Sequence, residues 1–183
     1  TLQGPVAKGS WLVSARRTHL DPLLAVAKDA LDAKALGYNF YDLQGKTHQI
    51  LSHRDQLTLA AYMGQDDLLY RFDELGFGLK WGNRTISSKW THLFDNNLFG
   101  NLLFTGSRFK AETNFDSEDV ELLEFNRLTD LSVKGDLSYF ASEHHTVEVG
   151  FNVKRQSVQY EFGEKERNWF NIDVEAYHSA IYA

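Results

Sequence analysis

The sequence predicts an all-β fold, an antiparallel segment of a transmembrane β-barrel with about eight meandering strands. The first observation is an alternation of apolar and polar residues with a period of two, which is typical of strands whose two faces meet different surroundings. The second is the length of these runs, roughly twice the 5–6 residues usual in soluble proteins. Because a membrane barrel needs strands of about 9–11 residues, the length favours a barrel that crosses a membrane.

The alternation is clearest between residues 131 and 153. The apolar set, which we expect to face outward, consists of Leu131, Val133, Gly135, Leu137, Tyr139, Val147, Val149, Phe151 and Val153. The intervening set, which carries the charges, consists of Ser132, Lys134, Asp136, Ser138, Glu148, Gly150, Asn152 and Lys154. One face therefore suits hydrocarbon and the other suits water, as in the wall of a membrane barrel.

The composition is compatible with this fold. The chain has 183 residues, a net charge of -6 and a mean hydropathy of -0.40. It contains no stretch of the roughly 18 apolar residues that predict a membrane helix, but barrel strands dilute their apolar residues with every second, polar one. The acidic balance argues against a nucleic-acid partner. Because cysteine is absent, disulfides and thiolate metal sites are excluded.

The first strand is predicted at about residues 10–18, with Trp11 on its apolar face. One short helix is predicted to follow at residues 19–37, with Pro22 near its start and Gly37 at its end. Its apolar residues recur at intervals of three and four: Leu20, Leu23, Leu24, Ala27, Ala30, Leu31 and Ala35. The pattern indicates an amphipathic helix that packs in an extracellular loop.

The later strands are separated by connections of two kinds. Four strands are predicted at about 38–52, 56–66, 76–94 and 98–113, and three more reach about 142, 161 and the end of the chain. Tight turns are predicted at 53–55, 95–97 and 142–144, and longer polar connections at 67–74, around 116–121 and at 163–168. Such strict alternation of short and long connections is typical of a membrane barrel with short periplasmic turns and longer extracellular loops.

Aromatic residues lie near both ends of the predicted strands. They are Trp90, Phe94, Tyr139 and Phe140 beside short turns and Trp81, Trp169 and Phe170 beside long loops. This placement resembles the aromatic girdles at the two membrane interfaces. The alternative is that aromatic residues simply favour strands.

Several segments resemble one protein family. They are residues 4–5, 9–18, 40–46, 51–55, 81–83, 90–94 and 180–183. In order and spacing they are similar to the early barrel of TonB-dependent outer-membrane receptors, particularly the large ones of Bacteroidetes-like bacteria. The match covers nearly the whole chain, so residues 1–183 are expected to be part of a single β-barrel domain without the plug domain.

The resemblance implies a location in the bacterial outer membrane and a barrel of about 22 strands closed by an N-terminal plug. It implies uptake of a scarce nutrient ligand, energised by a TonB-type coupling protein. The partners of this chain are then membrane lipid, the plug and the remaining barrel strands. We expect a piece of a larger protein, because the chain begins with Thr1 and its single methionine is Met63. Siderophore, cobalamin, glycan and peptide all remain open as ligands.

Seven polar residues are candidates for the barrel lumen, because they lie opposite the apolar residues of their strands. They are Arg16, Asp42, Gln44, Lys46, His48, Lys134 and Asp136. In the receptor interpretation they contact the plug or water, and they are not predicted to form a ligand site.

No catalytic, cofactor or metal site is predicted. The pair His144 and His145 lacks a third ligand at a suitable spacing, and the acidic segments at 66–67 and 116–121 lack a calcium-loop motif. The carboxylates Glu161, Glu164 and Glu166 lie in a polar loop without an apolar pocket to raise a pKa. An enzyme is therefore not expected.

Two alternatives stay open. One is a self-contained eight-stranded outer-membrane barrel that acts as an anchor or adhesin. The other is a soluble ligand-binding barrel whose apolar face points inward. The observation that separates the soluble barrel from the others is whether Val133, Leu137, Val149 and Phe151 contact lipid or are buried in a core.

Overall fold

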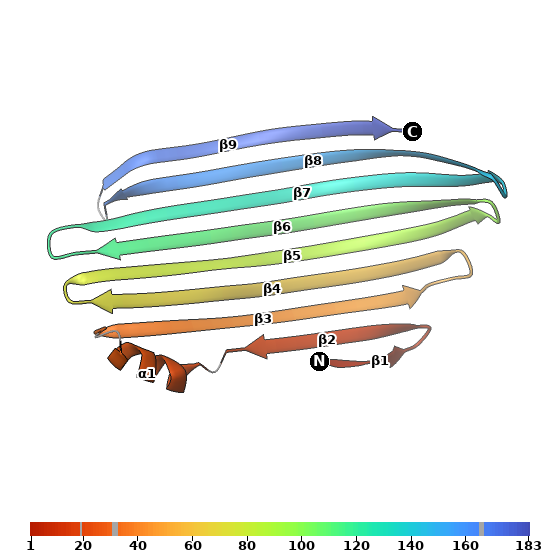
Figure 1. The fold of residues 1–183 in the computed structure, drawn as a ribbon. Helices are drawn as coiled ribbons and strands as arrows, with labels where there is room; N and C mark the ends of the chain where they lie inside the picture. The colour runs from red at the N-terminus through yellow and green to blue at the C-terminus, as the bar shows by residue number, and fades with distance from the viewer. Residues whose placement is uncertain (19, 31–32, 165–166) are drawn as a thin grey trace.

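The computed structural model describes residues 1–18, 20–30, 33–164 and 167–183. Within them, nine strands form one antiparallel sheet in which each strand pairs with the next along the chain (Figure 1). The strands are β1 (Leu2–Val6), β2 (Gly9–Arg17), β3 (Ala35–Ile50), β4 (Asp55–Phe72), β5 (Leu75–Asp95), β6 (Leu98–Asp116), β7 (Glu121–Ser142), β8 (His145–Glu164) and β9 (Arg167–Tyr182). The helix α1 (Asp21–Ala30) lies between β2 and β3.

The connections lie at two opposite rims of the sheet (Figure 1). The helix rim holds α1, the turn at residues 73–74 and the connection at 117–120. The far rim holds the connections at residues 7–8, 51–54, 96–97 and 143–144. Strands β3 to β9 have 16 to 22 residues each. That is about twice the length that a membrane crossing requires.

The sheet is open. Among the described residues β1 and β9 do not contact each other, so both are edge strands. Pro5 lies in β1 and has no N–H group to donate, whereas Ile181 near the end of β9 is 89% exposed. Such edges present backbone groups that other strands can pair with.

The sheet is a single layer without a conventional core. In the described part of the chain α1 contacts β3 alone, and Ala33 is the only buried hydrophobic residue. No helix in the same part is long and apolar enough to cross a membrane. The fold therefore relies on backbone pairing and on cross-strand side-chain pairs.

The number of strands corrects the prediction of about eight. The additional strand is β1, whose pairing with β2 places Leu2 opposite Val13. Its five residues are too few to show an alternation, and they include Gly4 and Pro5, which disfavour strands. Strands β2 to β9 correspond to the eight that the sequence predicts.

The helix is shorter than predicted. It ends at Ala30, whereas the prediction extended from residue 19 to 37. Residues 35–37 belong to β3 and pair with β4. At these residues the backbone pairing with a distant strand overrides the helical spacing of the apolar residues. His19 and Leu31, which the prediction included, lie outside the described residues.

The connections at the helix rim are also shorter than predicted. Residues 67–72 continue β4, so only residues 73–74 connect β4 to β5, and the acidic connection contracts to 117–120. The charged strand ends remain in the sheet because their side chains form ion pairs with residues of other strands. Arg71, for example, forms a salt bridge with Asp116. The predicted strict alternation of short and long connections is therefore wrong.

The turn after β4 is tied to the segment after α1. Lys34 Nζ lies 3.1 Å from Asp73 Oδ1 and 3.6 Å from Glu74 Oε1. The hydrogen bond to Asp73 raises the pKa of the Lys34 ammonium group. Asp73 adopts a φ of 50°, a left-handed conformation that aspartate tolerates in turns.

Candidate functional site

The pairing register gathers the predicted outward residues on one face of the sheet, which we call the band face. Val133 lies opposite Val153, and Leu137 lies opposite Val149. The same face continues across the other strands as a belt of apolar side chains, the apolar band. Its members include Trp11, Val13, Leu43, Leu57, Leu59, Met63, Ile86, Trp90, Leu102, Phe104, Leu131, Val133, Leu137, Tyr139, Val147, Val149, Phe151, Val153 and Ile181.

The apolar band is open to its surroundings. Ile86 is 57% exposed and Val153 is 50% exposed, although both lie within the sheet rather than at a terminus. Soluble monomers rarely expose continuous apolar patches larger than a few hundred Å². A surface of this kind needs an apolar medium or partner against it.

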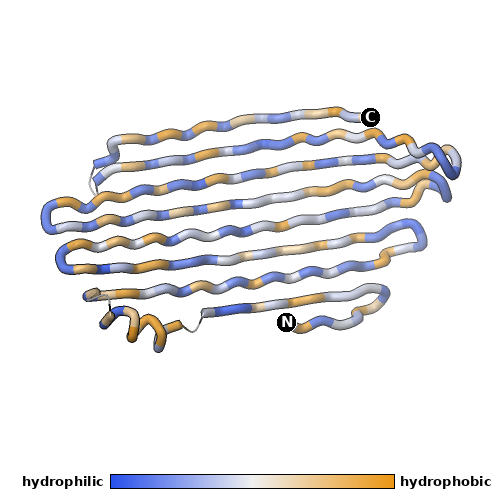
Figure 2. The backbone as a smooth tube through the Cα atoms, in the orientation of Figure 1, coloured by the Kyte–Doolittle hydropathy of each residue, from blue (hydrophilic) through white to orange (hydrophobic). Residues whose placement is uncertain are grey.

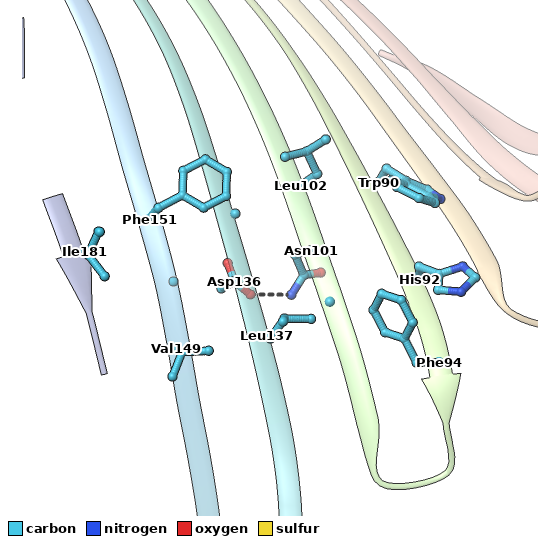
Figure 3. A pocket seen from close by; sticks show the side chains of 13 residues that line it. Trp90, His92, Phe94, Asn101, Leu102, Asp136, Leu137, Val149, Phe151 and Ile181 are labelled. Atoms are coloured by element: carbon cyan, nitrogen blue, oxygen red, sulfur yellow. Dashed lines mark hydrogen bonds between the residues drawn. The ribbon is translucent and has the colours of Figure 1, made fainter. Parts of the chain in front are cut away.

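A pocket lies within the apolar band near the far rim (Figure 3). It has a volume of about 500 Å³, and its lining includes Trp90, Leu102, Leu137 and Phe151. Gly135 makes room for one of these rings, because a Cβ there would lie 2.4 Å from Phe151 Cε1. The lining has the shape and chemistry to accept a hydrocarbon chain.

The seven residues predicted for the lumen all lie on the opposite face, which we call the reverse face. Arg16, Asp42, Gln44, Lys46 and His48 belong to β2 and β3, and Lys134 and Asp136 belong to β7. They form two separate groups, because β4, β5 and β6 lie between β3 and β7.

The structure joins two of the seven directly. Arg16 and Asp42 are cross-strand neighbours, with Arg16 Nη2 2.6 Å from Asp42 Oδ2. Asp136 accepts a hydrogen bond of 2.8 Å from Asn101 Nδ2 (Figure 3). His48 Nδ1 lies 3.0 Å from Thr58 Oγ1. These are separate pairwise contacts rather than a convergent ligand site.

Sequence reasoning missed other polar pairs on the reverse face. Lys154 Nζ lies 2.5 Å from Asp130 Oδ2, and Tyr38 donates a hydrogen bond of 2.7 Å to Asp66. All four residues lie opposite the apolar band in register. The alternation places each on this face, but only the register between strands identifies its partner.

The pairing register shows that the polarity of the two faces inverts toward the helix rim. Hydrophobic and hydrophilic residues alternate along the strands (Figure 2). The band face becomes polar there, with Gln65, Asp67, Lys80, Arg84, Arg108, Lys110, Glu112, Arg127, Gln159, Asp173 and Glu175. The reverse face becomes apolar, with Phe40, Leu68, Phe77, Leu79, Trp81, Phe109, Leu128, Val158 and Phe162. Of the aromatic residues predicted to form girdles, Trp81 lies on the reverse face. Trp90 and Tyr139 do border the apolar band.

A carboxylate organises the far rim just beyond the apolar band. Asp55 Oδ2 accepts a hydrogen bond of 2.6 Å from Ser52, and Asp55 Oδ1 lies 2.7 Å from His92 Nδ1. Trp90 Nε1 donates a further bond of 3.1 Å to Oδ1. These hydrogen bonds, that from Ser52 first, lower the pKa of Asp55 to about 2.

The described residues contain no group of three or more His, Cys, Asp or Glu side chains placed to hold a metal ion. His144 and His145 lie at the far-rim turn between β7 and β8. Glu161 and Glu164 belong to β8 rather than to a loop, and Glu166 lies outside the described residues.

The fold has counterparts among solved structures. The chain is similar to part of the ferric yersiniabactin uptake receptor FyuA from Yersinia pestis, with a TM-score of 0.51 and 12% identity, over 81% of this chain and 26% of FyuA. The chain shares the fold of an outer-membrane receptor barrel. The comparison confirms, for the fold, the resemblance to TonB-dependent receptors that the sequence motifs indicate.

The chain spans about a quarter of FyuA, with 26% of that receptor covered. The translocator domain of the autotransporter NalP from Neisseria meningitidis also has similarity, with a TM-score of 0.39 and 12% identity, over 88% of this chain and 63% of that domain. No protein-family profile matches the chain, and no curated protein matches it.

Proposed function

We propose that this chain forms part of the wall of an outer-membrane β-barrel of the TonB-dependent receptor type. The parent receptor takes up a scarce nutrient ligand. The observation that carries the proposal is the apolar band, exposed on one face of a single-layer sheet without a core among the described residues. Lipid is the medium that such a surface fits. The similarity to FyuA supports the same interpretation at the level of fold.

The height of the apolar band supports a membrane setting. From Leu131 to Tyr139 the band covers eight residue steps of β7, about 27 Å along the strand. A strand tilted by about 40° then covers about 21 Å along the membrane normal. The apolar belt of outer-membrane barrels is about 25 Å tall, so the two dimensions agree.

We call the half of the sheet near the far rim the far half and the half near the helix rim the helix half. In this proposal the reverse face of the far half lines the lumen. Arg16, Asp42, Gln44, Lys46 and His48 on one side and Lys134 and Asp136 on the other then contact water, the plug of the parent receptor or passing ligand. The far rim faces the periplasm, and the helix rim with α1 faces the exterior. The plug, the remaining strands and the TonB-type coupling protein are partners of the parent receptor.

The sidedness of four band residues separates the proposal from a soluble barrel. Val133, Leu137, Val149 and Phe151 are 36%, 40%, 42% and 42% exposed in the open sheet and face lipid in the proposed wall, whereas a soluble barrel would turn this apolar face inward. The open edges disfavour a self-contained barrel, because the described strands β1 and β9 do not pair. A wall that continues into further strands satisfies both observations.

Spin labelling tests the sidedness. The chain has no cysteine, so each residue from 147 to 153 can be replaced singly by cysteine and labelled in phosphatidylcholine vesicles. We expect odd positions to be accessible to oxygen, which concentrates in lipid, and even positions to a water-soluble nickel chelate. Residues 157 and 159 provide the control, because they lie on the band face of the same strand in the helix half, the half of the sheet near the helix rim, and we expect the chelate to reach them. Uniform accessibility from 147 to 153 would contradict the proposal.

A further inference from the structure

Basic side chains gather on the band face where the apolar band ends toward the helix rim. Five of them line one pocket of about 320 Å³ and form what we call the basic cluster: Lys80, Arg84, Arg108, Lys110 and Arg127. Glu112 is the one acidic residue in the same lining. The chain as a whole carries a net charge of -6, so the cluster is a local concentration of positive charge.

The register sets like charges against each other. Arg84 lies directly opposite Arg108 between β5 and β6, and Lys110 lies directly opposite Arg127 between β6 and β7. Like charges in directly opposed positions destabilise a sheet. Glu112 forms a salt bridge with Lys110, and within the described residues neither Arg84 nor Arg108 has a carboxylate in salt-bridge contact.

Arg127 is held in place and has a spare donor. Its Nη1 donates a hydrogen bond of 2.9 Å to Gln159 Oε1, and its guanidinium lies 4.9 Å from the centre of the Phe125 ring. Its Nε is buried without a hydrogen-bond partner among the described residues. A buried donor left unpaired destabilises the folded state, so an anionic acceptor that reached it would be stabilising.

The cluster lies immediately beyond the hydrocarbon-facing surface. Ile86 and Gly106 form the last row of the apolar band on β5 and β6, and Arg84 and Arg108 form the next row on the same face. Two residues along a strand measure about 7 Å. Met63 of the apolar band also lines the pocket, so the basic pocket opens beside apolar surface.

We propose that the basic cluster binds the phosphate groups of an anionic membrane lipid whose acyl chains lie on the apolar band. The inference rests on the proposed function, because it needs the apolar band to lie in a bilayer. Arginine forks match phosphate oxygens in geometry and charge, and basic residues at a membrane interface attract anionic headgroups. The adjoining apolar surface favours a lipid over a free anion, because it offers contact to the chains as well as to the headgroup.

Lipid binding to the full chain in neutral maltoside micelles tests the proposal. The probes are phosphatidic acid and phosphatidylcholine, and native mass spectrometry counts the bound lipid. We expect a preference for phosphatidic acid that the double variant Arg84→Gln/Arg108→Gln weakens about 30-fold and Arg84→Gln alone about fivefold. The matched control, Lys46→Gln/Lys134→Gln, removes the same charge from the reverse face and leaves the preference unchanged.

The possible outcomes separate this inference from the proposed function. Wild-type chain that enters micelles but binds phosphatidic acid no better than phosphatidylcholine overturns the lipid site alone. Inorganic phosphate that binds as tightly as phosphatidic acid overturns it as well, because the site then takes a soluble anion. A chain that stays folded in buffer and does not enter micelles overturns the proposed function. Circular dichroism verifies that the variants keep their strand signal, which we expect because the substitutions relieve repulsion.

Discussion

The two halves of the sheet use the same strands with opposite sidedness. In the far half of β7, Val133 lies on the band face and Ser132 on the reverse face. In the helix half of the same strand, Arg127 lies on the band face and Leu128 on the reverse face. From Leu122 to Phe140 the alternation continues without a break in register, so only the chemistry of the two faces changes.

This inversion indicates that each long strand passes through two environments. In the proposed barrel the band face of the far half meets hydrocarbon and the reverse face meets water. In the helix half of that barrel the band face meets water, and the reverse face is apolar enough to pack against loops or against other parts of the wall. Strands of about twice the crossing length are what such an arrangement requires.

A charge placed in the apolar band tests the comparison with the largest expected effect. Val149→Arg puts a guanidinium near the middle of the band, where we expect a loss of about 2–4 kcal/mol in the free energy of unfolding. Ser157→Arg, on the same strand and face but in the helix half, lies opposite Glu175 and is expected to cost less than about 1 kcal/mol. Urea unfolding in phosphatidylcholine vesicles measures both. Equal losses would mean that the two halves share one environment.

The reverse face gives the complementary test. Leu128 lies between Phe109 and Val158 in register, so Leu128→Asn removes two apolar cross-strand pairs. We expect a loss of about 1–2 kcal/mol in the free energy of unfolding, measured in the same vesicles. Ser132→Asn in the far half is the matched control, and we expect it to change stability by less than about 0.5 kcal/mol. A larger effect at Ser132 would reverse the assignment of the two halves.

The sequence alone predicts which residues share a face in the far half, but not in the helix half. At residues 131–139 and 147–153 alternation alone assigns every residue to its face, because water and hydrocarbon impose strong opposite preferences. Beyond the band the preference of each face changes sign, and the sequence alone predicts a loop at residues 67–72, which the structure shows to be part of β4. Charged residues at the end of a strand resemble a loop in the sequence. Once their partners on the neighbouring strands are known, the same residues are seen to extend the strand.

Cross-strand register is the information that a single sequence lacks. Arg84 and Arg108 lie on the two strands of one hairpin, β5 and β6. The local pattern of neither strand predicts that these two side chains face each other. The same holds for the salt bridge of Arg71 with Asp116. Sidedness is a local property of a strand, whereas a site made of facing side chains depends on the pairing of strands.

Acid stability tests the far rim, just beyond the band. The pKa of Asp55 is about 2 in the folded chain, below its ordinary value of 3.8, so the ionised carboxylate favours the folded state. This contribution is complete above about pH 4 and is lost as the pH falls through 2. We expect the urea midpoint to fall over this range in the wild type and to fall less in Asp55→Asn. An equal decline in both would assign the acid sensitivity to other carboxylates.

The smallest expected effect concerns the ion pair of Arg16 with Asp42 on the reverse face of the far half. The Arg16 side chain is 69% exposed, so a double-mutant cycle of Arg16→Ala and Asp42→Ala should give a coupling energy below about 1 kcal/mol. The pair of Arg155 with Glu175 on the band face, with exposures of 49% and 43%, should give a similar value. Both pairs then meet water, as the inverted sidedness requires. A coupling above about 3 kcal/mol at Arg16 alone would mean that the reverse face is enclosed and dry, and the far half would no longer resemble a hydrated lumen.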